Sequence, residues 1–79
     1  MNNKIEKIHE AAQKCGGEVW DNYSGRGMYG ATCYGIDCDS EADLLMAIGA
    51  VGLPKPKLDS MGLGIIAYWP AIKQEMQNT

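Results

Sequence analysis

Residues 18–37, EVWDNYSGRGMYGATCYGID, decide the fold that we expect for this chain. Two runs of residues that favour β-strands, 18–24 and 28–37, lie on either side of a glycine-rich segment. Glycine adopts the positive φ angles of tight hairpin turns without steric cost. We therefore expect a β-hairpin whose turn is Ser24-Gly25-Arg26-Gly27.

Side chains alternate between the two faces of a strand, which assigns the residues of both runs to faces. In the first run, Val19, Asp21 and Tyr23 share one face, and Trp20 and Asn22 share the other. The second run is apolar on both faces, with Met28, Thr32, Tyr34 and Ile36 on one and Tyr29, Ala31 and Cys33 on the other. Alternation alone does not show which face of this hairpin is buried.

A helix is expected on each side of the hairpin. Residues 3–14 repeat apolar side chains at a spacing of three to four, and Gly16-Gly17 would end that helix. Ser40 can accept a hydrogen bond from the backbone N–H of Asp43, which is typical of a helix start. An apolar stripe follows, and Gly52, Pro54 and Pro56 end the second helix; the stripe consists of Leu44, Leu45, Ile48 and Val51.

The last part of the chain predicts one more strand, residues 63–69, after a loop at 54–62. Pro70 would open a final helical turn that reaches Met76. The order α-β-β-α-β predicts an α+β fold: a three-stranded sheet, strand order 2-1-3, with two helices packed on one face. An antiparallel meander is the alternative. We expect one domain over residues 1–79, with about 1–3 and 77–79 frayed.

Composition excludes several classes of function. The net charge is −3 and the seven Lys and Arg residues are scattered, which disfavours direct binding of nucleic acid. No apolar run is long enough to span a membrane. Three cysteines, an odd number, and an N-terminal stretch without an apolar core favour a cytoplasmic protein with free thiols.

The motifs that resemble enzyme sites are weak. Gly25, Gly27 and Gly30 spell GxGxxG, but the string joins two strands, whereas a dinucleotide site needs it to open a helix. Cys33 and Cys38 point to opposite faces of a regular strand, and paired zinc knuckles are missing. His9 is the sole histidine and lies on the polar side of its helix. We therefore expect no catalytic residue, no metal and no cofactor.

Surface features instead indicate a protein partner. Four carboxylates fall within seven residues, and Asp21 or Glu18 on the paired strand would lie nearby. Such a patch could occupy a basic groove on a nucleic-acid-binding protein, although helix capping and a solvated loop explain much of it. Six Trp and Tyr residues are too many for so small a core, which favours a partner surface or a homodimer. The candidate partner-binding residues are Arg26, Tyr29, Asp37, Asp39, Glu41 and Asp43.

Two strings, YSGRGMYGATCYGI (Tyr23–Ile36) and DSMGLGIIAYWP (Asp59–Pro70), resemble segments of a family of short, uncharacterised phage and mobile-element proteins. The similarity covers about a third of the chain and leaves out the first helix. Size, acidity and element order are also similar in a general way to anti-CRISPR proteins, which bind and block CRISPR effector complexes. That second resemblance implies a biological setting, the blocking of CRISPR effector complexes, but it assigns no role to any residue.

Together these features predict a small phage-encoded inhibitor that binds a protein, of the anti-CRISPR kind, and acts by occupancy in the host cytoplasm. The expected partner is a protein such as a CRISPR effector subunit. The alternative is a small accessory or regulatory homodimer domain that binds an anion or nucleotide at the glycine hairpin.

Overall fold

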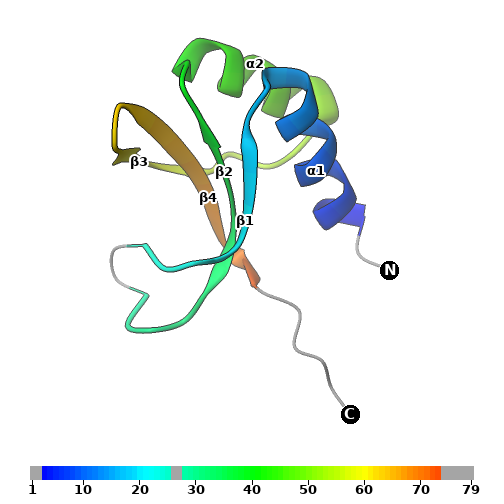
Figure 1. Cartoon of the computed structure of the whole chain (residues 1–79). Coiled ribbons are helices and arrows are strands. Elements are labelled where there is room, and N and C mark those ends of the chain that lie inside the picture. The colour runs from blue at the N-terminus through cyan, green and yellow to red at the C-terminus, as the bar shows by residue number, and fades with distance from the viewer. Residues whose placement is uncertain (1–2, 26–27, 74–79) are drawn as a thin grey trace.

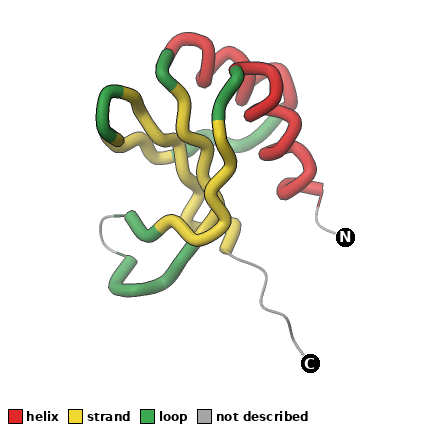
Figure 2. Tube along the Cα trace, viewed as in Figure 1, coloured by secondary structure: helices red, strands yellow, loops and turns green. Residues whose placement is uncertain are grey.

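Two helices and four strands follow one another in the order α1-β1-β2-α2-β3-β4 (Figures 1 and 2). The computed structural model describes residues 3–25 and 28–73. The element bounds are α1 Asn3–Cys15, β1 Glu18–Tyr23, β2 Cys33–Cys38, α2 Glu41–Val51, β3 Lys57–Met61 and β4 Gly64–Lys73. The predicted α+β class is thus confirmed.

The sheet has four antiparallel strands in the order β1-β2-β4-β3. The predicted three strands in the order 2-1-3 were wrong: residues 57–61, expected as loop, form the edge strand β3, and β4 pairs antiparallel with β2 instead of lying beside β1. A two-residue turn with Gly62 at φ +59° reverses the chain, and β4 returns between β2 and β3. The polar composition of β3 suits an edge that faces water, and for that reason it resembled a loop in sequence.

The hairpin of β1 and β2 is present, but its connection is longer than predicted. β2 begins at Cys33, so residues 24–32 join the two strands, where a strand from Met28 had been expected. Tyr29 and Gly30 have φ of +51° and +90°, and the Ala31 N–H donates to the Met28 carbonyl at 2.9 Å. This turn interrupts the extended backbone before β2. Arg26 and Gly27 of the predicted turn lie outside the described residues.

β4 continues through Pro70 to Lys73, so the helical turn predicted to start at Pro70 was wrong. The pairing register shifts at this point: Tyr34 pairs with Trp69, whereas Cys33 pairs with Lys73. Proline has no N–H to give to a sheet and is tolerated at such irregularities. The part of the predicted turn beyond Lys73 lies outside the described residues.

Both helices end where the sequence predicted. Gly16 has φ +69°, and the Gly17 N–H donates to the Ala12 carbonyl at 2.8 Å. Ser40 caps the start of α2, because its Oγ accepts a hydrogen bond from the Asp43 N–H at 3.3 Å. Gly52, with φ +78°, caps its end. In both helices a left-handed glycine satisfies carbonyls of the last turn, so short sequence signals determine the helix ends.

Both helices cover the same face of the sheet (Figure 1). The stripe predicted for α2 needs one correction, because Leu45 is 41% exposed and Ala47 is buried in its place. The indole N–H of Trp69 donates to the Pro54 carbonyl at 2.7 Å and ties β4 to the end of α2. The residues buried between helices and sheet include Ile8, Ala11, Ala12, Leu44, Ala47, Ile48, Tyr34, Ile36, Ala67 and Trp69.

Substitution by alanine should change the free energy of unfolding in opposite directions at Gly49, within α2, and at Gly52, which follows α2. Gly49 is helical with open space around the position of a Cβ, so Gly49→Ala should raise the free energy of unfolding by about 0.5–1 kcal/mol. Gly52 has a left-handed φ, so Gly52→Ala should lower it by about 1 kcal/mol. Urea denaturation of the two variants and the unchanged protein measures both effects. Equal effects would contradict the assignment of the helix end.

Candidate protein-binding site

The second face of the sheet, opposite the helices, is partly covered by the segment before β2. Cys33, Ile66 and Tyr68 are buried there although they do not belong to the core under the helices. A methyl group placed on Gly25 would lie 2.5 Å from Cε2 of Tyr68, so the backbone at Gly25 packs directly on that ring. The Met28 Sδ accepts hydrogen bonds from the Gly25 N–H and the Cys33 thiol. Gly25 of the GxGxxG string therefore has a packing role.

Tyr23 completes the cover on this face. The predicted faces of the first strand were wrong at Tyr23, because a register shift after Trp20 turns Tyr23 to the same side as Trp20. The Tyr23 ring lies 4.9 Å from that of Tyr68, measured between centroids, and its hydroxyl donates to Asp59 Oδ2 at 3.2 Å. This contact joins β1 to β3, the two outer strands of the sheet.

The environment of Tyr23 gives a titration prediction. Burial, with the nearby Asp59 carboxylate, raises the pKa of Tyr23 to about 12 from 10.0. Because the folded-state pKa is the higher one, the stabilisation is fully present below pH 10 and is lost as the pH rises through 12. Tyrosinate absorbance should show one tyrosine that ionises near pH 12 and disappears in Tyr23→Phe. Asp59→Asn should lower that pKa, and an unchanged value would contradict the role of Asp59.

Most of the aromatic side chains are covered by the fold itself. Tyr34, Tyr68 and Trp69 are buried, and Trp20 and Tyr23 are half-buried. Tyr29, in contrast, is 98% exposed. The expected surplus of exposed aromatic surface is therefore reduced to Tyr29 among the described residues, because the sheet buries aromatic rings on both of its faces.

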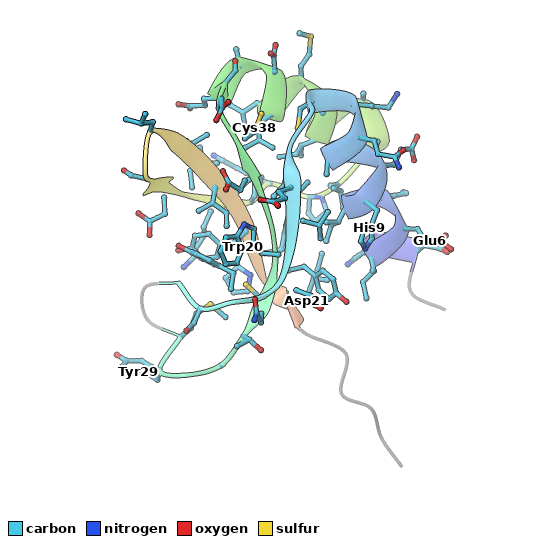
Figure 3. The ribbon with its side chains drawn as sticks, in the orientation of Figure 1. Glu6, His9, Trp20, Asp21, Tyr29 and Cys38 are labelled. Carbon is cyan, nitrogen blue, oxygen red and sulfur yellow. The ribbon has the colours of Figure 1, made fainter. Side chains whose placement is uncertain are left out.

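The predicted partner-binding residues fall into separate places. Tyr29 precedes β2, and Asp39 follows it, so the two lie at opposite ends of that strand; Figure 3 shows Tyr29 far from Cys38, the neighbour of Asp39. Arg26 lies outside the described residues. Asp37, Asp39, Glu41 and Asp43 lie in the chain at the junction of β2 and α2. Asp37 and Asp39 line one hollow, whereas Asp43 lines a second one together with Lys14.

Glu18 joins this surface through the sheet. It is the direct antiparallel partner of Asp37, so both side chains leave the same face of the sheet. Asp21, the other residue expected nearby, lies at the register shift toward the far end of β1. We call the five carboxylates the acidic end: Glu18, Asp37, Asp39, Glu41 and Asp43.

A hollow of about 210 Å³ lies beside three residues of the acidic end, Glu18, Asp37 and Asp39. Its lining combines the turn after α1, the start of β1 and the end of β2: Gly16, Gly17, Glu18, Asp37, Cys38 and Asp39. A Cβ on Gly17 would lie 2.5 Å from the Asp37 carbonyl oxygen, so the missing side chain lets the turn approach β2. The hollow is open, mainly polar and large enough to admit one lysine or arginine side chain.

A fully exposed leucine, Leu63, lies beside the acidic end. A Cβ on its neighbour Gly64 would lie 2.6 Å from the Cys38 carbonyl oxygen and 3.4 Å from the Asp39 Cα. The turn between β3 and β4 is therefore held against the end of β2. Leu63 could not be assigned to this surface from sequence, because the contact depends on the pairing of β4 with β2.

The pair of Glu18 and Asp37 places like charges directly opposite each other, which destabilises a sheet. Glu18→Gln should therefore raise the free energy of unfolding by up to about 0.5 kcal/mol at low salt. Added salt should shrink the gain, because it screens exposed charges. Glu10→Gln on the exposed side of α1 is the matched control and should give no gain. Equal effects of the two substitutions would show that the pair does not repel.

Other chemical sites are poorly supported among residues 3–25 and 28–73. No group of three His, Cys, Asp or Glu side chains is placed there to hold a metal ion. Cys33 and Cys38 face opposite sides of the sheet, as predicted, and His9 is exposed on α1 (Figure 3). Within the same residues, neither helix is long and apolar enough to cross a membrane.

No protein-family model matches the chain, and no curated protein or solved structure shows significant similarity to it. The resemblance to short phage proteins therefore stays a prediction from the two sequence strings. Any function of this chain must therefore be inferred from the geometry of the acidic end.

Proposed function

We propose that this chain is an inhibitor that binds a basic protein surface through the acidic end and acts by occupancy. The observation that carries the proposal is the cross-strand pair of Glu18 and Asp37. Helix capping accounts for carboxylates in the first turn of α2, such as Glu41 and Asp43. It does not account for two carboxylates opposite each other on a sheet. Their repulsion opposes folding and is relieved when a cationic partner binds.

The partner surface that fits is a groove that normally holds nucleic acid. Such grooves are lined by Lys and Arg that neutralise phosphates, and a set of carboxylates offers them the same charge. The hollow between Gly17 and Asp39 would receive one basic side chain. Leu63 would add an apolar contact at the rim of the same surface. The charges would then steer the two proteins together, and the contacts at the hollow and at Leu63 would orient the complex.

The biological setting that we propose is a phage-encoded inhibitor in the host cytoplasm, with a CRISPR effector complex as the target. The size of 79 residues, the net charge of −3 and the two phage-like strings support this setting. Tyr29 lies at the other end of β2 and is not part of the proposed contact surface.

The test uses the full chain and purified CRISPR effector complexes loaded with guide RNA. We expect one complex to bind the chain and to lose its affinity for target DNA, as measured by electrophoretic mobility. Asp39→Lys with Glu41→Lys should weaken inhibition at least tenfold, because the charges then repel. Leu63→Ser should weaken it without changing the charge, and thermal stability should stay the same because Leu63 is fully exposed.

Glu6→Lys with Glu10→Lys is the matched control, because it changes the net charge equally on the exposed side of α1. This variant should inhibit like the unchanged protein. Equal loss in both double variants would mean that net charge alone acts. Binding to none of the complexes, with unaltered CRISPR interference in cells that express the chain, would overturn the proposed target.

A further inference from the structure

We propose that Cys15 and Cys38 are a site of oxidative modification, where a low-molecular-weight disulfide such as oxidised glutathione converts the two thiols into an intramolecular disulfide. This inference is independent of the proposed inhibitory function. It depends on how the end of α1 meets the end of β2 and on the different surroundings of the third cysteine.

The two cysteines meet although 22 residues separate them in the chain. The Cys38 thiol donates to the Cys15 carbonyl oxygen at 3.4 Å. The Cys15 thiol donates to the Ala12 carbonyl oxygen at 3.6 Å and also interacts directly with the Cys38 thiol. Cys38 belongs to the core between the helices and the sheet, and the partly buried Cys15 packs against that core. Contact between the two side chains is a precondition for a disulfide, whose Cα and Cβ separations are also restricted.

The turn Gly16-Gly17 creates this proximity. Gly16 reverses the chain in the left-handed conformation, and Gly17 packs on the backbone of Asp37. A Cβ on Gly17 would lie 3.1 Å from the Cys15 Sγ, so a side chain there would compete for the space beside the thiol. The glycines therefore hold the end of α1 directly against the last residues of β2.

The two thiols differ in exposure, which suggests an order of reaction. Cys15 is half-buried and Cys38 is buried. The Cys15 thiolate would attack one sulfur of oxidised glutathione and expel one glutathione thiolate. The Cys38 thiolate would then attack the Cys15 sulfur of the mixed disulfide and expel the second. The two cysteines lose two electrons and two protons, and oxidised glutathione gains them to become two glutathione molecules.

Cys33 provides an internal comparison. It is buried on the opposite face of the sheet, and its thiol donates to the Met28 Sδ at 3.8 Å. Burial raises the pKa of Cys33, and burial together with the Cys38 thiol raises the pKa of Cys15. Both thiols are therefore less ionised near neutral pH than a free cysteine. What distinguishes Cys15 from Cys33 is a second thiol within reach.

The test treats the full chain with excess oxidised glutathione at pH 8, alkylates the remaining thiols and measures the intact mass. We expect a product with one alkylated cysteine and no attached glutathione. Chymotrypsin cleavage after Tyr34 separates Cys33 from Cys38 and should yield a linked Cys15–Cys38 peptide pair. A bond that includes Cys33, a covalent dimer, a stable glutathione adduct or three alkylated cysteines would overturn the proposal.

Two substitutions extend the test. Cys33→Ala should leave the disulfide unchanged, whereas Cys38→Ala should trap glutathione on Cys15. Should Cys38→Ala not fold, the peptide map of the unchanged chain decides alone. The oxidised protein should also melt roughly 10–20 °C above the reduced one, because the bond restricts the unfolded chain. A lower melting temperature would show that the native fold does not accommodate the bond.

Discussion

The antiparallel pairing of β2 with β4 is the interaction on which the rest of the structure depends. Ile36 opposite Ala67 faces the helices, and Gly35 opposite Tyr68 faces the other way. Both faces of this central pair are buried, which is unusual for a chain of this size. The helices, the outer strands and the segment before β2 all pack on these two strands, so loss of the pairing would expose both cores at once.

The two ends of β2 have different neighbours in the fold. At its start, the segment of residues 24–32 folds back over Tyr68, and aromatic contacts close the second face. At its end, Gly17 in the turn before β1 and Gly64 at the start of β4 approach the backbone of β2. The absence of a side chain at Gly17 leaves room for the Cys15 thiol, and its absence at Gly64 lets the turn of Leu63 approach Cys38 and Asp39.

The acidic end shows a conflict between stability and binding. Carboxylates at the start of α2 favour the helix, since they lie at the positive end of its dipole. Glu18 opposite Asp37 has the reverse effect on the sheet, because like charges face each other. This pair and the fully exposed Leu63 are the features on which the proposed contact with a basic partner depends.

The sequence by itself determined the elements whose signals are local. Ser40, Gly16 and Gly52 mark helix ends through hydrogen bonds within a few residues, and the pairing of β1 with β2 follows from two adjacent β-favouring runs. Only the tertiary structure decided the strand order and the edge strand β3, because β3 is polar and gains its hydrogen bonds from β4.

The same distinction applies to the candidate site. The run from Asp37 to Asp43 was visible as a charge cluster, since its members are neighbours in the chain. The additions of Glu18 and Leu63, and the meeting of Cys15 with Cys38, depend on strand register and close glycine packing between distant segments. Non-local pairing of this kind leaves no periodic trace in a single sequence, so only the folded chain reveals it.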